Sequence, residues 1–296
     1  MELRILKYFL MVAREENITK AALLLHVTQP TLSRQLMQLE EELGVSLFRR
    51  SNHNIVLTQE GLLLKRRAQE IVELEAKARS EFAKKDEELS GEITIGTGES
   101  RSMSLFSAML TSFHALHPLV RFSLYSGNAD HVKDRIEQGL LDIGLLMEPV
   151  DISKYDFVRL PMKEQWGLLV PEASDLAKRS AIVPADLVGL ALMTPGRTLV
   201  QEEIAAWAEV EPSQLNLVLT YNLLNNVAWM VKQGLGAALC LHLDVHYDGL
   251  TFVSLQPQME VRSVIVWKKN QTTAAATAAF IDYAKKYDLS MARDSE

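Results

Sequence analysis

The segment from residue 28 to residue 43 has the pattern of a helix with one buried and one exposed face. At about 100° per residue, its leucines fall within a narrow arc and can pack together; they are Leu32, Leu36, Leu39 and Leu43. Pro30 is tolerated in the first turn, because the early N–H groups of a helix have no helical partner. The sequence therefore predicts an amphipathic helix with a polar edge near its start.

A second helix is predicted directly before this one. Two segments repeat the order of an apolar residue, a threonine suited to an N-cap and an apolar residue four positions after the cap: Ile18, Thr19 and Leu23, then Val27, Thr28 and Leu32. The two helices are therefore expected to start nine residues apart. Residues 3–14 also have a helical period, and β-forming residues around a polar tip predict a hairpin over 44–58.

Closely joined helices whose second member begins with polar side chains are typical of a helix-turn-helix. The exposed start of the second helix carries side chains that can bond base edges and phosphates: Gln29, Thr31, Ser33 and Arg34. Arg49 and Arg50 in the hairpin would reach the DNA backbone as a wing. The spacing alone leaves open an ordinary amphipathic pair whose polar face meets only water.

The distribution of charge is compatible with DNA binding although the net charge is −7. Residues 1–58 hold seven Lys/Arg and six Asp/Glu, a net charge of +1 that leaves −8 for the other residues. A DNA reader needs positive charge only where phosphates lie, and an acidic remainder discourages the other domain from binding DNA. A single cysteine, Cys240, excludes an internal disulfide, and no run approaches the ~18 apolar residues of a membrane span, so we expect a cytoplasmic protein.

A long helix is predicted after the hairpin, over 59–90. Positions spaced alternately by four and three residues form a heptad seam with one polar member: Leu57, Gly61, Leu64, Ala68, Ile71, Glu75, Ala78 and Phe82. Such a narrow stripe suits a partner helix and predicts dimerisation. The alternative is a linker helix that lies on its own domain, since Gly61 and Glu75 weaken the seam.

After Ser90, short apolar runs alternate with helical segments, which predicts a mainly parallel sheet covered on both faces. The runs include EITIGT, VRFSLYS, FVRLPM, WGLLV, GAALCL and SVIVW. About 200 residues and two such series predict two α/β lobes. We place lobe I at about 91–162 plus 266–296, and lobe II at about 163–265.

Several segments together are similar to one known family. They are ITKAALLLHVTQPTLSRQLMQLEEELGVSLFRRS, continuing into VLTQEG, and later GEITIGTGE, GLLDIGLLME and VKQGLGAALCL. In this order they resemble the LysR-type transcriptional regulators over the whole chain. The resemblance implies an α/β protein with an N-terminal winged helix-turn-helix (1–58), a dimerisation helix (59–90), and an effector domain (91–296) whose two lobes are similar to type 2 periplasmic binding proteins.

The resemblance also implies partners and DNA contacts. The expected partners are double-stranded DNA with an inverted-repeat operator, further copies of the chain in a homodimer or homotetramer, and RNA polymerase as an additional candidate. The complete set of predicted DNA contacts is Thr28, Gln29, Pro30, Thr31, Ser33, Arg34, Arg49, Arg50 and His53. The wing tip departs from the family, in which basic residues are frequent there, because this sequence has Asn52, His53 and Asn54.

A second site is predicted where strands lead into helices, since ligands of open α/β sheets bind at the carboxyl ends of strands and helix starts attract anions. The predicted effector-binding residues are Gly98, Glu99, Ser100, Arg101, Ser102, Asn128, Thr194, Pro195, Gly196, Arg197 and Asn222. Arg101 and Arg197 would add a counter-charge for a small carboxylate. Glu99 argues against a simple anion site, and would instead bind an amine or a hydroxyl, or pair with Arg101.

No catalytic residue, metal or cofactor is predicted. Two histidine pairs, at 114 and 117 and at 242 and 246, lack a third ligand at a suitable spacing, and GxSxG and GxxxxGK[ST] are absent from the sequence. An enzyme would need a convergent acid, base or nucleophile. A further competing class is a small-molecule-binding protein whose N-terminal domain serves only for association, and it predicts no sequence-specific DNA binding.

Overall fold

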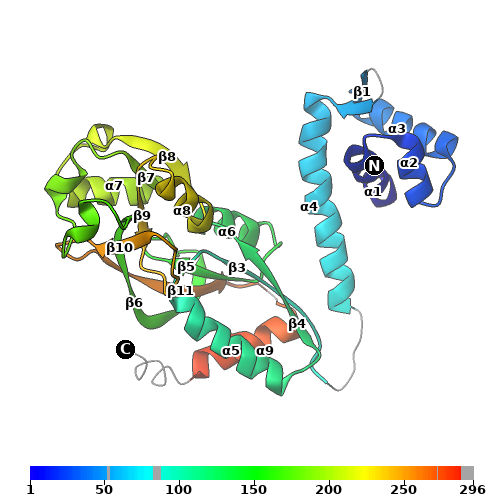
Figure 1. The fold of residues 1–296 in the computed structure, drawn as a ribbon. Coiled ribbons are helices and arrows are strands. Elements are labelled where there is room, and N and C mark those ends of the chain that lie inside the picture. Colours follow the sequence, from blue (N-terminus) through cyan, green and yellow to red (C-terminus); the bar gives the residue numbers. More distant parts are fainter. Residues whose placement is uncertain (52–53, 83–87, 272, 288–296) are drawn as a thin grey trace. The chain divides into compact units, whose positions relative to one another are not determined.

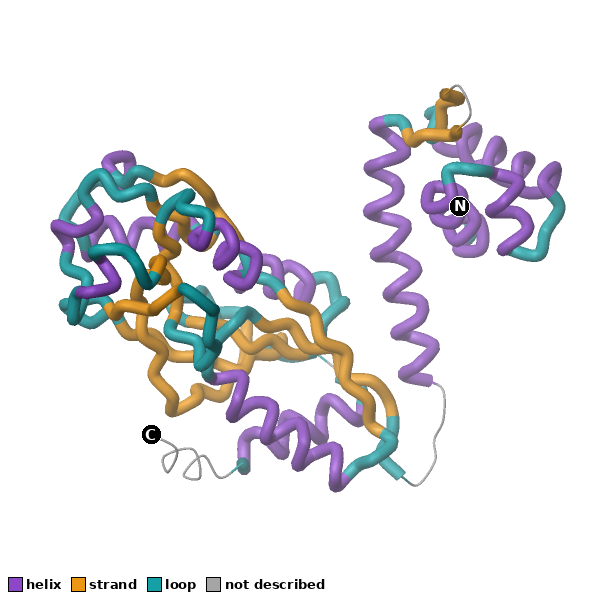
Figure 2. The backbone as a smooth tube through the Cα atoms, in the orientation of Figure 1, coloured by secondary structure: helices purple, strands orange, loops and turns teal. Residues whose placement is uncertain are grey.

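The computed structural model describes residues 1–51, 54–82, 88–271 and 273–287. The chain forms two compact units, Met1–Ala83 and Lys84–Glu296. The first unit is mostly helical, and the second combines a large sheet with helices (Figures 1 and 2).

The described residues of the N-terminal unit form four helices and a hairpin. Its elements are α1 (Leu3–Glu15), α2 (Ile18–Leu24), α3 (Gln29–Leu43), β1 (Phe48–Ser51), β2 (Asn54–Leu57) and α4 (Gln59–Phe82). Leu32, Leu36 and Leu39 are buried against Phe9 of α1, so the predicted buried face of α3 is confirmed for these three leucines. Leu43 is 39% exposed and lies outside that face.

The start of α2 differs from the prediction. Asn17, not Thr19, is the N-cap, and its side chain accepts a hydrogen bond from the Lys20 N–H at 3.0 Å. The helices α2 and α3 therefore begin eleven residues apart rather than nine. The prediction was wrong because asparagine is as good an N-cap as threonine and lay two positions earlier. Thr28 does cap α3, accepting from the Thr31 N–H at 3.4 Å.

Helix α4 packs on its own unit along α1. Ala68 is fully buried in the core of this unit, and Lys7 Nζ of α1 lies 2.8 Å from a carboxylate oxygen of Glu75. Ala68 and Glu75 of the predicted heptad seam therefore contact their own domain, as expected for a linker helix that lies on that domain. Other apolar side chains of α4 are exposed, namely Leu62, Leu63, Ile71 and Leu74.

Gly61 marks a close approach between α4 and the hairpin. A Cβ atom at this position would lie 2.1 Å from the Leu47 carbonyl oxygen and 2.9 Å from a Leu57 methyl group. Although alanine is the better helix former, Gly61→Ala is expected to destabilise the N-terminal unit by about 1–3 kcal/mol, as overpacking does. Faster amide hydrogen exchange in α1 and α4 would report this loss of stability.

The control for this substitution is Gln69→Ala, on the exposed side of the same helix. It is expected to change stability by no more than about 0.5 kcal/mol. Equal exchange rates for Gly61→Ala and Gln69→Ala would contradict the close approach.

The described part of the second unit contains one nine-stranded sheet with the strand order β4-β3-β5-β11-β6-β9-β7-β8, and β10 pairs with β6. Its strands are β3 (Gly91–Thr97), β4 (Val120–Ser126), β5 (Ile143–Met147), β6 (Tyr155–Pro171), β7 (Leu192–Pro195), β8 (Leu217–Tyr221), β9 (Ala237–Leu241), β10 (Leu250–Ser254) and β11 (Glu260–Lys268). Its α-helices are α5 (Ser102–Leu116), α6 (Ala129–Glu137), α7 (Thr198–Trp207), α8 (Leu224–Lys232) and α9 (Ala275–Lys286). Short 3-10 helices cover Leu176–Lys178, Pro184–Leu187 and Pro212–Gln214.

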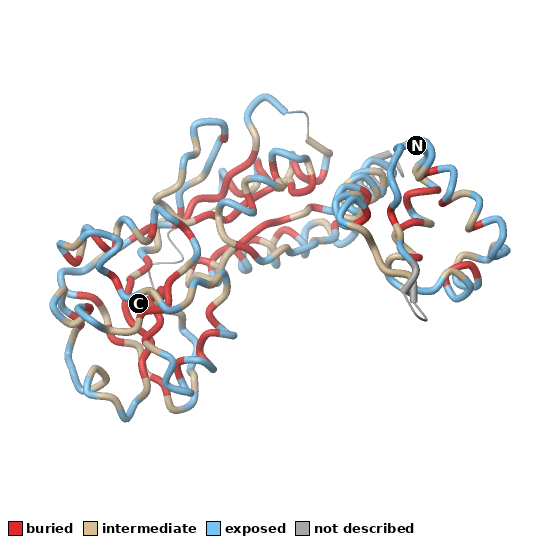
Figure 3. Tube along the Cα trace, turned by 90° about the horizontal axis from the view of Figure 1, so that it is seen from above, coloured by how far each residue is buried: buried red, intermediate tan, exposed pale blue. Residues whose placement is uncertain are grey.

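The sheet is divided into two α/β lobes, each covered by helices on both faces. In lobe I, around β3, β4 and β5, α5 and α9 pack side by side on one face through Phe106 and Phe280, and α6 covers the other face with Val132 (Figure 1). In lobe II, around β7, β8 and β9, α7 covers one face with Ile204 and α8 the other with Val227. Buried residues follow the strands and the inner sides of these helices (Figure 3).

The sheet is mixed, so the prediction of a mainly parallel sheet was wrong. Parallel pairs occur within each lobe, as between β3 and β4 and between β7 and β8. The strands β6 and β11 instead pair antiparallel with each other, because they carry the chain in opposite directions between the lobes. The apolar runs FVRLPM and WGLLV, which were expected to be separate strands, are parts of the single 17-residue strand β6.

Candidate functional site

The start of α3 presents the polar edge that the sequence predicted. Thr28, Gln29, Pro30, Thr31 and Arg34 are exposed, and Ser33 is half-buried. The edge is ordered by local hydrogen bonds, because Gln29 Nε2 donates to Ser33 Oγ at 2.8 Å and the hydroxyl oxygens of Thr28 and Thr31 lie 2.8 Å apart. Within the described part of the chain no carboxylate forms an ion pair with Arg34, so its guanidinium N–H groups are available for a base or a phosphate.

The hairpin is attached to α3 by Glu40. Its Oε1 atom accepts hydrogen bonds from the backbone N–H groups of Leu47 at 2.6 Å and Phe48 at 3.2 Å. Arg49 in β1 is exposed. The side chain of Arg50 and the whole of His53 lie outside the described residues. The hairpin is therefore held in place beside the helix whose start carries the polar edge.

The second site is a cavity of about 80 Å³ between the two lobes. It is lined by seven of the predicted effector-binding residues, namely Gly98, Glu99, Ser100, Asn128, Pro195, Arg197 and Asn222. The other four predicted residues, Arg101, Ser102, Thr194 and Gly196, do not line it. Both lobes thus contribute strand ends and helix starts to one cavity.

Most of the cavity wall is apolar and was missed from the sequence. It includes Leu146, Met147, Trp166, Val200, Leu224, Cys240, Leu241 and Leu243. Cys240 and Trp166 lie inside apolar runs of the sequence. The sequence pattern of such a run does not distinguish a side chain of the core from a side chain of a cavity wall. Burial raises the pKa of the Cys240 thiol to about 12, so this group adds no charge to the cavity.

Arg197 connects the lobes across the cavity. Its side chain is 6% exposed, its Nε lies 3.2 Å from Oδ2 of Asp130 at the start of α6, and its Nη2 donates to the Pro149 carbonyl oxygen at 3.1 Å. Glu148, another charged residue of the wall, forms an ion pair with Arg159 at 2.6 Å. Both charges are therefore compensated within the protein.

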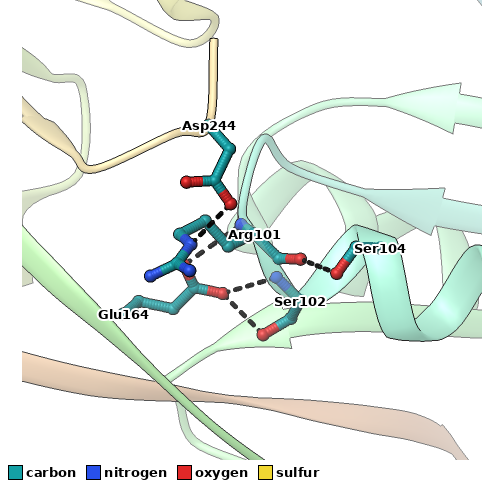
Figure 4. A network of polar contacts seen from close by, with 5 residues as sticks. All are labelled: Arg101, Ser102, Ser104, Glu164 and Asp244. Atoms are coloured by element: carbon teal, nitrogen blue, oxygen red, sulfur yellow. Dashed lines mark hydrogen bonds and ion pairs between the residues drawn. The ribbon is translucent and has the colours of Figure 1, made fainter. Parts of the chain in front are cut away.

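Two helix starts near the cavity are occupied by carboxylates of the protein itself. Glu99 of lobe I accepts a hydrogen bond from the backbone N–H of Leu224 at the start of α8 in lobe II. At the start of α5, the fully buried Glu164 accepts from the Ser102 N–H at 2.8 Å, the Ser102 hydroxyl at 2.5 Å and the Arg101 N–H at 3.1 Å (Figure 4). The α5 start therefore already binds an anion.

Arg101 forms an ion pair with Asp244 and not with Glu99, which the sequence offered as one alternative. Its Nε donates to Oδ2 of Asp244 at 2.8 Å, while Ser104 donates its hydroxyl to the Arg101 carbonyl oxygen (Figure 4). Arg101 is in lobe I and Asp244 follows β9 in lobe II, so this ion pair also joins the lobes. Glu99 does not pair with Arg101 among the interactions of the described residues.

Trp166 is the unusual member of the cavity wall. It is 4% exposed, and its indole Nε1 is buried without a hydrogen-bond acceptor in the described chain. Leaving a buried donor unpaired costs about 1–3 kcal/mol, and such groups are rare in folded proteins. This indole N–H is therefore a buried donor that has no acceptor in the described chain.

Comparison with known protein families identifies both halves of this arrangement. The helix-turn-helix unit matches the family described as "Bacterial regulatory helix-turn-helix protein, lysR family" over residues 3–62, and the "LysR substrate binding domain" matches residues 86–288. The chain belongs to the LysR family of transcriptional regulators. As a LysR-family regulator it combines a DNA-binding helix-turn-helix with an effector-binding domain, and it is not an enzyme.

Individual relatives agree with this family. The Hca operon transcriptional activator HcaR of Escherichia coli (strain K12) is 31% identical over 242 residues, which cover 81% of each chain. The HTH-type transcriptional regulator BsdA of Bacillus subtilis (strain 168) is 32% identical over 161 residues, covering 54% of this chain and 55% of BsdA.

Solved structures of a LysR-family regulator share the fold. CbnR is 20% identical and superposes with a TM-score of 0.75, covering 97% of this chain and 99% of CbnR. Full-length CbnR complexed with its target DNA superposes with a TM-score of 0.73 at the same coverage. In the described part of the chain, no helix has both the length and the apolar character that a membrane span requires.

Proposed function

We propose that this LysR-family regulator binds an inverted-repeat operator as a homodimer or homotetramer, with the start of α3 in the major groove. The observation that carries the proposal is the exposed and hydrogen-bonded polar edge of α3, beside an arginine with no ion pair in the described chain. The proposed contacts are Thr28, Gln29, Pro30, Thr31, Ser33 and Arg34, with Arg49, Arg50 and His53 from the wing. The exposed leucines of α4 are candidates for the contact between copies.

The effector in this proposal is a small molecule held between the lobes. A cavity of about 80 Å³ that both lobes line supports it. An engineered protein cavity that binds benzene measures about 150 Å³, so an effector of few heavy atoms fits this arrangement of the lobes. More specifically, we propose that the effector carries a carboxylate. This carboxylate would share the guanidinium group of Arg197 with the side chain of Asp130.

The switch in this proposal is a change in how the two lobes are held. An effector that binds one arrangement better shifts the population toward it. The change would alter contacts between copies, the spacing of their DNA-binding domains and hence the bend of the DNA. We propose a DNA-binding domain at 1–58, a linker at 59–90 and an effector domain at 91–296. We also propose that the protein acts in the cytoplasm and that RNA polymerase is a further partner.

Selection of genomic fragments bound by the full-length protein tests the DNA part of the proposal. The expected result is enrichment of fragments that share an inverted repeat, with protection of both half-sites in a footprint. Retention of DNA without any shared sequence, with an affinity that only follows the salt concentration, would support the association-only alternative and reject the proposal. Identical footprints and DNA bends with and without the effector would reject the switching mechanism but would leave the proposed DNA binding standing.

A further inference from the structure

We propose that the effector is a small zwitterionic amino acid, whose carboxylate binds Arg197 and whose ammonium group binds Glu99. The inference rests on the proposed function and deepens it, because it keeps the carboxylate effector between the lobes and adds a second recognised group. It also assigns Glu99 as the residue that selects an amine.

The first argument is that the carboxylate of Glu99 is only partly used by the protein. Glu99 lines the cavity and is half-buried. Its Oε2 accepts a hydrogen bond from the Leu224 N–H, while its Oε1 has no donor in the described chain and keeps accessible surface. A carboxylate offers about four acceptor sites, and no cation of the described residues pairs with this one. The cavity wall therefore carries a negative charge that an ammonium group can neutralise.

The charge of Glu99 acts on two other residues of the cavity wall. Burial is the main cause that raises the pKa of the Cys240 thiol to about 12, and the nearby Glu99 carboxylate contributes to the same rise. Burial also raises the pKa of the Tyr221 hydroxyl, and Glu99 again adds to the rise. Since Cys240 and Tyr221 both line the cavity, the negative charge of Glu99 lies close to this space.

The second argument is that Arg197 has a guanidinium nitrogen to spare. Its Nε donates to Asp130 and its Nη2 to the Pro149 carbonyl oxygen, while its Nη1 has no acceptor in the described chain and keeps accessible surface. The side chain of Asp130 is 55% exposed, so water can solvate this carboxylate if it moves away. A ligand carboxylate can therefore bind Nη1 while Asp130 stays on Nε.

The third argument is that these two charges together disfavour a ligand with a single charge. Glu148, another charged residue of the wall, is already paired with Arg159. A simple anion at Arg197 would lie in the same cavity as the unpaired carboxylate of Glu99, and a simple amine at Glu99 would lie in the same cavity as the guanidinium of Arg197. Like charges repel strongly where water is scarce, so a molecule that carries both charges is preferred.

The remaining wall describes the body of this molecule. Leu146, Met147, Val200 and Leu241 line a cavity of about 80 Å³. An apolar wall with a few charged groups orients a ligand by its polar atoms and covers its apolar surface. The cavity therefore favours an amino acid with a small apolar side chain.

Isothermal titration calorimetry of the full-length protein at pH 7 tests this inference with three matched probes. L-Alanine carries both charges, propanoate lacks the ammonium group, and ethylamine lacks the carboxylate. A hydrogen bond to a charged group contributes enough to change affinity about tenfold or more. L-Alanine is therefore expected to bind at least about tenfold more tightly than either of the other two probes.

A pair of variants assigns the selection to Glu99. Glu99→Gln keeps an acceptor oxygen for the Leu224 N–H but loses the charge. It is expected to bind L-alanine about tenfold more weakly than the wild type and propanoate no more weakly, so that the preference for L-alanine disappears. Glu202→Gln, at an exposed residue of α7 that does not line the cavity, makes the same chemical change and is expected to keep the preference.

Three results would overturn the inference. Propanoate bound by the wild type as tightly as L-alanine would show that no amine is selected, although the proposed carboxylate effector would stand. Ethylamine bound as tightly as L-alanine would show that the carboxylate is not recognised, and no measurable binding of any probe would reject the ligand class. A failure of the proposed DNA binding is a separate result, in which the full-length protein selects no shared DNA sequence.

Discussion

Replacing Arg34 with alanine is expected to weaken binding to the operator by about 1–3 kcal/mol and to relax the base preference at one position of each half-site. A loss of this size corresponds to roughly a 5- to 150-fold weaker affinity. The reason is that Arg34 is exposed, lies on the polar edge of α3 and has no ion pair in the described chain, so its guanidinium can bond two acceptors of a guanine in the major groove. Titration of the full-length protein against operator variants measures both effects.

Two further variants determine how Arg34 acts. Arg34→Lys keeps the charge but loses the two-point geometry, so its affinity is expected to fall between those of the wild type and Arg34→Ala. Arg4→Ala removes one positive charge from α1, where Arg4 pairs with Glu2 at 3.3 Å, and is expected to leave base preference unchanged. Unchanged affinity for Arg34→Ala would reject α3 as the recognition helix. An equal loss on unrelated DNA would assign Arg34 to a phosphate instead.

The helical part of the fold could be predicted because its information is local. The spacing of Leu32, Leu36 and Leu39 identified both the helix and its buried face. Cap assignment was less certain, since Asn17 and Thr19 are both good caps and only the backbone decides between them. The mixed sheet could not be predicted, because β6 and β11 are apolar like the parallel strands and their direction depends on pairings distant in the sequence.

The cavity could be predicted only in part for a similar reason. Polar residues at strand ends identified members of its wall such as Ser100 and Asn222, because the geometry of open sheets places these ends together. Trp166 was missed, since an apolar run does not reveal which of its side chains borders a cavity. Glu164 was also missed, because its partner Ser102 lies 62 positions earlier in the chain.

Glu164→Ala is expected to lower the free energy of unfolding of the effector domain by about 3–5 kcal/mol. A hydrogen bond to a charged group contributes about 1.5–3 kcal/mol, and Glu164 accepts three such bonds at the α5 start while fully buried. Its removal leaves the N–H groups of Arg101 and Ser102 unpaired and deletes the negative charge that the α5 dipole favours. Urea unfolding followed by tryptophan fluorescence measures the effect, because all four tryptophans lie in this unit.

Glu164→Gln separates the contribution of shape from that of charge. The amide keeps one acceptor oxygen for Ser102 but places an N–H₂ group where Oε2 accepts from Arg101, so two donors would face each other. Its destabilisation is therefore expected to lie between those of the wild type and Glu164→Ala. Glu172→Ala, at an exposed carboxylate just beyond the end of β6, is the matched control and is expected to change stability by no more than about 0.5 kcal/mol. If Glu164→Ala were as stable as this control, the α5 start would not depend on a protein carboxylate.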